Sequence, residues 1–230
     1  MDESSKPAPT YPLCPSTLYW AAYPFTLVLA GVLRIFAPRW RVSGRKNIPV
    51  RGPVILAPNH LSDADPPFLS TSTARPVWYM AKKELFEVPV LKHIMHFSQS
   101  FPVERGGERA GADRVALRRA EDLLKAGQAV VVFPEGKLSK DGELQELLPG
   151  VSLLALRAGV RIVPVGIAGT NAVVPHGAVT PRLTLKRIHI HFGEALDFSD
   201  LAHLPAREQR KLCVEQLETG MRDAIAIARG

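Results

Sequence analysis

Cysteine is scarce in this chain of 230 residues, which contains only Cys14 and Cys213. The two lie near opposite ends of the chain, and neither has the neighbouring cysteines or histidines of a zinc site. Two cysteines so far apart also do not make the disulfide framework of a small secreted domain. We therefore expect both to be inert packing residues in a reducing compartment.

Several common catalytic motifs are absent as well. The chain has no G-x-S-x-G elbow, no P-loop and no G-x-G-x-x-G turn, so serine hydrolases, nucleoside triphosphatases and dinucleotide-binding enzymes lack their signals. The segment HIMH (93–96) has the spacing of two ligands on one helix face but no evident third ligand. We expect neither a metal nor a bound cofactor.

Positive charge is in excess, but the basic residues are not concentrated in one tract. The formal net charge is +7, which favours an anionic partner. The basic residues are scattered, and no zinc-finger or RNA-recognition signature is present. We therefore expect an anionic membrane surface or a phosphorylated substrate, and no nucleic acid.

Long hydrophobic runs are limited to one segment near the N-terminus. Thr17 to Leu33 carries no charged residue, which is only marginally long enough for a spanning helix of roughly 20 residues. Aromatic residues precede the run and Arg34, Arg39 and Arg41 follow it, as at a membrane interface. We predict a peripheral or monotopic helix over 17–37 at the cytoplasmic face of a membrane. A spanning helix and a buried core helix remain alternatives.

Apolar runs and amphipathic segments alternate through the rest of the chain. Predicted strands cover 54–58, 77–82, 100–105, 129–136, 161–167 and 185–193, and predicted helices cover 108–127, 150–159 and 205–228. Continuous apolar strands separated by helices predict a single α/β domain with a mostly parallel mixed sheet flanked by helices. We place this domain at 41–230, after an N-terminal tail and membrane-associating helical segment at 1–40.

Polar residues follow three of the predicted strands, where ligands bind in open α/β sheets. His60 follows the first, and a nearby carboxylate could orient one imidazole nitrogen and leave the other as a general base. Asp63 has the spacing of a neighbour on a helix, whereas Asp65 needs a turn that Pro66 and Pro67 could confine. The spacing leaves the partner open, and either aspartate could instead be a helix N-cap.

The other two strand ends carry groups suited to a phosphorylated polyol. Arg105 precedes two glycines and a predicted helix N-terminus, which favours a phosphate. The segment FPEGKLS offers Glu135, Gly136, Lys137 and Ser139. A carboxylate there could accept hydrogen bonds from hydroxyl groups, and glycine permits close approach of a ligand.

Taken together, NHLSDAD, FPVER, FPEGKLS and VPVGIAGT resemble the glycerolipid acyltransferase family, which includes the bacterial and plastid lysophosphatidate acyltransferases. The resemblance covers roughly 42–170. It implies that His60 and Asp65, spaced as HX4D, are the catalytic pair. It also implies that Arg105 meets the acceptor phosphate and that Glu135 and Gly136 help to seat the acceptor. Lys137 and Ser139 belong to the same block.

The resemblance further implies transfer of a fatty acyl group from acyl-CoA or acyl-ACP to a lysophospholipid hydroxyl, with 1-acyl-glycerol-3-phosphate as the expected acceptor. The thioester is a co-substrate and not a cofactor. Family members commonly have Thr-Arg where this chain has Lys137 and Leu138, and Lys binds phosphate differently from Arg. Remodelling of another lysolipid, or a non-catalytic module that binds anionic lipid, are the alternative hypotheses.

Overall fold

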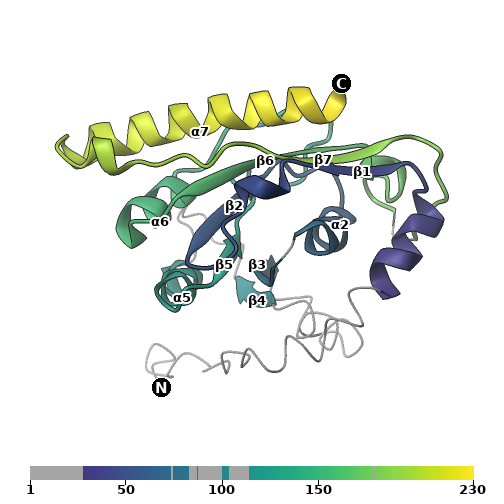
Figure 1. Cartoon of the computed structure of the whole chain (residues 1–230), viewed down its shortest axis with the longest axis horizontal. Helices are drawn as coiled ribbons and strands as arrows, with labels where there is room; N and C mark the ends of the chain where they lie inside the picture. The colour runs from purple at the N-terminus through teal and green to yellow at the C-terminus, as the bar shows by residue number, and fades with distance from the viewer. Residues whose placement is uncertain (1–27, 74, 83–86, 88–99, 104–113, 179) are drawn as a thin grey trace, which may run out of the picture.

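The described residues form one seven-stranded sheet flanked by helices (Figure 1). The computed structural model describes residues 28–73, 75–82, 87, 100–103, 114–178 and 180–230. The strands are β1 (Trp40–Ser43), β2 (Val54–Pro58), β3 (Val77–Lys82), β4 (Ser100–Val103), β5 (Ala129–Val131), β6 (Ile162–Ala168) and β7 (Ile188–Phe192). Their order across the sheet is β1-β7-β6-β2-β5-β3-β4. This confirms the predicted α/β fold.

Strand direction determines which loops meet at each edge of the sheet. β6, β2, β5, β3 and β4 run parallel to one another, whereas β7 is antiparallel to β6 and parallel to β1. The C-terminal ends of the five parallel strands therefore share an edge with the N-terminal ends of β1 and β7. We call this the upper edge.

Helices cover both faces of the sheet. They are α2 (Asp65–Ser72), α5 (Arg114–Lys125), α6 (Gly150–Ala158) and α7 (Ala206–Arg229), with 3-10 turns at Arg45–Asn47, Thr170–Ala172 and Ser199–Leu201. Residues 28–36 are also helical. In Figure 1, α7 crosses β6 and β7 on one side, and α2 lies on the other side of the sheet.

The alternation of side chains along β2 produces the two cores. Val54 and Leu56 pack in one hydrophobic cluster, with α2 and the 28–36 helix. Ile55 and Ala57 pack in the other, with α5, α6 and α7. All four are fully buried, and a buried aliphatic side chain stabilises the fold by about 1.5–3 kcal/mol. A strand covered on both faces explains the continuous apolar run in the sequence.

Glycine lets α7 approach β6 closely. A Cβ atom built on Gly166 would lie 2.1 Å from the Ala224 carbonyl oxygen, and one on Gly220 would lie 3.1 Å from Pro164 Cγ. Because no side chain larger than a hydrogen fits at Gly166, the backbone of α7 rests almost directly on the strand.

Several predicted elements differ from the structure, and three of the differences have a clear physical reason or bear on the site. The prediction contained no strand at β1, which pairs with β7 and whose Ser43 hydroxyl bonds His189 Nε2 (2.7 Å) and His191 Nδ1 (2.8 Å). β5 was expected to continue to residue 136 but ends at Val131, because Pro134 cannot donate to a strand ladder. The sequence had also suggested a helix beginning at the two prolines, and α2 begins one residue earlier at Asp65.

Part of the predicted 17–37 helix is visible as the helix over 28–36, and residues 1–27 lie outside the described residues. Its Leu33 is buried, and the following Trp40 packs edge-to-face on Phe68 of α2, with ring centroids 5.1 Å apart. In the described part of the chain, no helix is both long enough and apolar enough to cross a bilayer.

Candidate active site

The end of β2 is fixed to β6 by a side chain. Asn59 Nδ2 donates to the Ile167 carbonyl oxygen (3.0 Å), and the Ile167 N–H donates to Asn59 Oδ1 (2.7 Å). The buried Asn59 amide thus makes the pair of hydrogen bonds that a strand backbone would make. The sheet pairing continues while the backbone turns away, and the next residue, His60, emerges at the upper edge.

The imidazole of His60 is oriented by Asp65. His60 Nδ1 lies 2.9 Å from Asp65 Oδ2, and the same oxygen accepts the backbone N–H groups of Leu61 (2.6 Å) and Ser62 (2.9 Å). Asp65 is completely buried, whereas Asp63 is exposed. The structure therefore pairs His60 with Asp65, the aspartate that spacing alone did not select.

This geometry defines the tautomer of the histidine. An ionised carboxylate only accepts hydrogen bonds, so Nδ1 carries the proton and Nε2 keeps its lone pair. Within the described part of the chain, no hydrogen bond occupies Nε2. The His60 side chain is 12% exposed. An imidazole held this way can accept a proton from a hydroxyl group that reaches Nε2.

Residues that follow β5 contact both the ring and the backbone of His60. The His60 ring stacks on Phe133, with ring centroids 4.0 Å apart and planes at 25°. Glu135 Oε1 accepts the His60 backbone N–H (2.8 Å), and Oε2 accepts the Gln145 N–H (2.9 Å). Glu135 is 3% exposed, and this burial raises the pKa of its carboxyl group despite the two hydrogen bonds. Both oxygens of Glu135 are thus directed at the backbone.

The remainder of the FPEGKLS segment closes the loop around His60. Gly136 has φ of 64°, which favours glycine. The Ser139 N–H donates to the His60 carbonyl oxygen (2.7 Å). The single proton of its buried hydroxyl is shared between two acceptors, Asp141 Oδ1 (2.9 Å) and the Glu143 carbonyl oxygen (2.8 Å). The backbone of His60 is therefore held on its N–H by Glu135 and on its carbonyl by Ser139.

The predicted site residues fall into three groups. His60, Asp65, Glu135 and Ser139 form one hydrogen-bonded network, Gly136 shapes its turn, and Lys137 is exposed beside it. Arg105, the expected phosphate ligand, lies outside the described residues, as does the HIMH segment.

Sequence reasoning missed four members of the network: Asn59, Ser62, Phe133 and Gln145. Ser62 Oγ donates to the Val174 carbonyl oxygen (2.7 Å) and accepts the Ala64 N–H (3.0 Å), which ties the histidine loop to the loop after β6. A polar Asn directly after an apolar strand was the one available signal, because such a residue needs a partner when buried.

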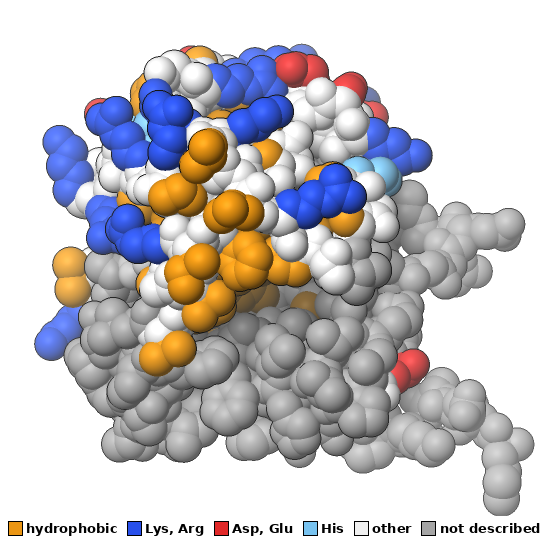
Figure 2. Space-filling model, turned by 90° about the vertical axis from the view of Figure 1, so that its right-hand side faces the viewer, with side chains coloured by type: hydrophobic (Ala, Val, Ile, Leu, Met, Phe, Trp, Pro, Cys, Tyr) orange, Lys and Arg blue, Asp and Glu red, His pale blue; other side chains and the backbone are white. Residues whose placement is uncertain are grey.

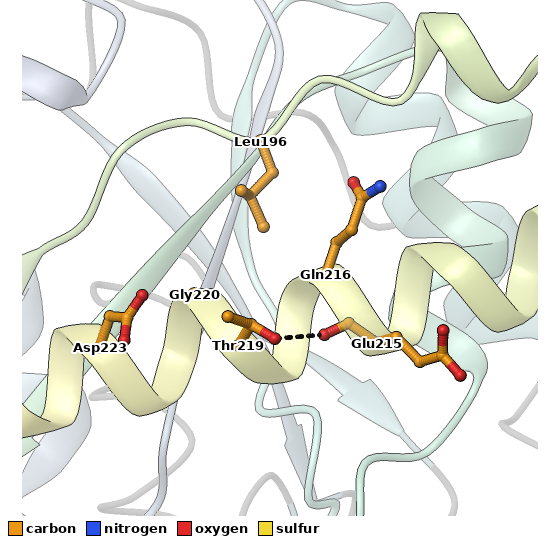
Figure 3. A pocket seen from close by; sticks show the side chains of 6 residues that line it. All are labelled: Leu196, Glu215, Gln216, Thr219, Gly220 and Asp223. Atoms are coloured by element: carbon orange, nitrogen blue, oxygen red, sulfur yellow. Dashed lines mark hydrogen bonds between the residues drawn. The ribbon is translucent and has the colours of Figure 1, made fainter.

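A separate hollow lies beside α7 (Figure 3), with Leu196 opposite residues of that helix. Its lining consists of Leu196, Glu215, Gln216, Thr219, Gly220 and Asp223. None of these belongs to the histidine network, so the hollow is not the candidate active site.

Comparison with known proteins places the chain in a family. Residues 39–168, more than half of the chain, match the family model described as Acyltransferase. The chain belongs to the acyltransferase family. The matched range of this acyltransferase includes His60, Asp65, Glu135 and the whole of β2 through β6.

Curated relatives share one name across plants and bacteria. The chain is 31% identical to the chloroplastic 1-acyl-sn-glycerol-3-phosphate acyltransferase LPAT1 of Arabidopsis thaliana over 60% of this chain and 38% of that protein. It is 26% identical to the 1-acyl-sn-glycerol-3-phosphate acyltransferase of Bacillus subtilis over 80% of this chain and 86% of that one. The acyltransferase spans less than two fifths of the length of the chloroplastic relatives.

A solved structure shares the fold. The crystal structure of the 1-acyl-sn-glycerophosphate (LPA) acyltransferase PlsC from Thermotoga maritima aligns with a TM-score of 0.65 and 24% identity, over 90% of this chain and 79% of that one. The fold of this acyltransferase is therefore similar to that of a solved protein.

Proposed function

We propose that this acyltransferase transfers a fatty acyl group from an acyl thioester to the free hydroxyl of a lysophospholipid, with 1-acyl-glycerol-3-phosphate as the acceptor and phosphatidate as the product. The observation that carries the proposal is the His60–Asp65 pair, in which a buried carboxylate holds Nδ1 at 2.9 Å and leaves Nε2 free among the described residues. The substrate class is taken from the relatives, which are 1-acyl-sn-glycerol-3-phosphate acyltransferases by name.

The chemistry needs one base and no covalent enzyme intermediate. His60 Nε2 takes the proton from the acceptor hydroxyl as its oxygen attacks the thioester carbonyl carbon. The C–S bond then breaks, and the imidazolium returns the proton to the leaving thiolate. Asp65 stabilises the imidazolium that forms between these events, and general base catalysis of this kind contributes about 10²–10⁴-fold.

Positioning accounts for much of the remaining rate, because a base must be held within hydrogen-bonding reach of the proton it removes. Phe133 fixes the plane of the ring, while Glu135 and Ser139 fix the backbone that carries it. In this proposal, Arg105 and Lys137 bind the phosphate of the acceptor. The acyl donor is acyl-CoA or acyl-ACP. The enzyme works on an anionic membrane at its cytoplasmic face, where its lipid substrates reside.

A second acceptor class has a specific observation in its favour. Lys137 and Leu138 stand where the family commonly has Thr-Arg, and Lys137 is exposed beside the network. A lysine provides a point charge without the bidentate fork of arginine. Remodelling of a lysolipid with a different headgroup is therefore the alternative function.

A thiol-release assay tests the proposal. Purified protein is given acyl-CoA or acyl-ACP with a panel of lysolipids, beside His60→Ala. We expect release with 1-acyl-glycerol-3-phosphate that depends on His60. Release only with another lysolipid would establish the alternative, and no release with any acceptor would refute both.

A further inference from the structure

An apolar strip crosses one face of the molecule (Figure 2). Exposed aliphatic side chains come from two segments, the 28–36 helix and residues 182–186, and are Val28, Val32, Ile35, Leu183 and Leu185. Leu183 is 69% exposed and Leu185 is 71% exposed. Two leucines this exposed and only two positions apart add to a large apolar patch, and large apolar patches on a protein surface mark interaction sites.

The local backbone forces these leucines outward. The N–H of Thr184 donates to the Phe36 carbonyl oxygen of the 28–36 helix (2.9 Å), and Thr184 itself is buried. The flanking Leu183 and Leu185 therefore point away from the protein. This hydrogen bond joins segments almost 150 residues apart in the sequence into one surface.

Cations accompany the strip, and acids are missing from it. The sequence has no Asp or Glu between Glu3 and Asp63, or between Glu146 and Glu194. Both segments of the strip fall in these intervals. Exposed basic residues lie in or close to the two segments, among them Arg34, Arg39, Arg41, Arg182 and Lys186. In Figure 2, Lys and Arg side chains lie on both sides of the hydrophobic ones.

The strip also lies at the same edge of the sheet as the candidate active site. The 28–36 helix precedes β1 and residues 182–186 precede β7, so both segments adjoin the upper edge, where His60 and Glu135 follow their strands. Leu29 and Phe36 pack in the same hydrophobic cluster as Leu61 and Phe133.

We propose that residues 182–186 are a second membrane-contacting element, which docks together with the 28–36 helix on a bilayer that contains anionic lipid. Leu183 and Leu185 enter the interfacial region, and Arg182 and Lys186 meet lipid phosphates. Apolar side chains bordered by cations, without acids, are complementary to such a surface. The proposal rests on the proposed function for its lipid substrate, but its binding test does not.

Vesicle binding of the full chain tests this element. Vesicles of phosphatidylcholine, alone or with phosphatidylglycerol, are sedimented with wild type, Leu183→Ser/Leu185→Ser, and Arg182→Ser/Lys186→Ser. The matched control is Val50→Ser, which is 82% exposed and lies before β2 at the opposite edge of the sheet. Thermal unfolding shows that each variant is folded.

We expect the leucine variant to lose affinity for the anionic vesicles by about tenfold or more. The arginine–lysine variant should lose affinity for anionic vesicles only, by about fivefold per charge, and Val50→Ser should bind as wild type. Unchanged binding by a folded leucine variant would overturn the proposal. A change in the sedimentation velocity of that variant without a change in vesicle binding would assign the strip to self-association and also overturn it.

Activity separates this proposal from the proposed function. With an acceptor dispersed as monomers, the leucine variant should turn over at the wild-type rate, because it lacks only the docking contact. If no acceptor supports turnover but vesicle binding falls as expected, the proposed function fails and the docking element stands.

Discussion

One oxygen of Asp65 carries all of the hydrogen bonds of that carboxylate. Oδ2 accepts from His60, Leu61 and Ser62, while Oδ1 is buried and has no partner in the described part of the chain. The side chain therefore has two roles: it accepts three hydrogen bonds, and it provides a negative charge beside the imidazole.

The Asp65→Asn substitution removes the charge and keeps the hydrogen bonds. An asparagine oxygen in the Oδ2 position preserves all three hydrogen bonds, but the imidazolium loses its counter-charge, so we expect kcat to fall by about 10²-fold or more. Thiol release with the preferred acceptor measures the effect. Asp63→Asn is the control and should stay within about twofold of wild type, since Asp63 is exposed. A nearly active Asp65→Asn enzyme would contradict the assigned role.

Glu135→Gln distinguishes a positioning residue from a substrate ligand. Both oxygens of Glu135 accept backbone N–H groups, and an amide can accept only one of them without turning its NH₂ toward a donor. We expect kcat to fall by about tenfold with little change in the KM for the acceptor, because the His60 backbone is displaced. A raised KM with an unchanged kcat would instead show that Glu135 binds the acceptor directly, as the family resemblance implies.

Glu135 should also make the stability of the wild-type protein depend on pH, and the Glu135→Gln variant should lack this dependence. Burial raises the pKa of the Glu135 carboxyl above its ordinary value of 4.5. The folded protein then keeps a proton that the unfolded chain has lost, so the free energy of unfolding falls as pH rises from that value toward the folded pKa. Urea denaturation between about pH 4 and 7 should show this decline in wild type relative to Glu135→Gln, and parallel curves would refute it.

The sequence predicted the types of residue in this site better than their contacts. His60 and the FPEGKLS segment stand out because polar residues interrupt apolar strands. Asp65, Glu135 and Ser139 act through hydrogen bonds to backbone groups of a loop. Such contacts depend on how the loop turns, which spacing along the chain does not specify.

At the scale of elements, the contact between α7 and β6 depends on Gly166. We expect Gly166→Ala to destabilise the fold by about 1–3 kcal/mol, because its methyl group would overlap the Ala224 carbonyl at 2.1 Å and push the helix outward. The midpoint of thermal or urea unfolding measures the loss. Gly31→Ala is a suitable control, since nothing lies within 4 Å of its added methyl group in an exposed helix. Equal stability of the two variants would contradict the close approach.

Elements with a strong local pattern of apolar residues were the most predictable. The predicted strand 54–58 coincides with β2, and the predicted helix 150–159 exceeds α6 by one residue. β1 was missed because it is a short strand of four residues at the end of the described sheet, and its pairing partner there, β7, lies far away in the sequence. Pairing between distant segments leaves no local pattern of apolar residues to detect.

At the scale of the whole molecule, charge is distributed unequally. Two long intervals of the sequence lack acids and contain the apolar strip, whereas the stretch that begins with Glu194 and ends with Asp223 contains seven Asp and Glu residues, counting both ends. Two of them, Glu215 and Asp223, line the hollow on α7 (Figure 3). The molecule should therefore face an anionic bilayer with the strip and keep α7 in water.

Cysteine labelling tests this orientation. In a Cys14→Ser background, Leu183→Cys should be protected from a soluble maleimide by anionic vesicles, whereas Thr219→Cys on α7 should react equally with and without them. The native Cys213 gives little background, because burial raises the pKa of its thiol to about 11. Protection of both positions would indicate vesicle aggregation, and protection of Thr219→Cys alone would reverse the proposed orientation.

Trp40 contacts both the 28–36 helix and α2. The Arg34 guanidinium of the 28–36 helix sits 5.3 Å from the centre of its ring, and Phe68 of α2, the helix that begins at Asp65, packs against its edge. Indole fluorescence responds to nearby charge and to the polarity of its surroundings. In a variant whose other two tryptophans, Trp20 and Trp78, are replaced by phenylalanine, the emission of Trp40 would therefore report on both the segment proposed to meet lipid and the helix that holds the carboxylate.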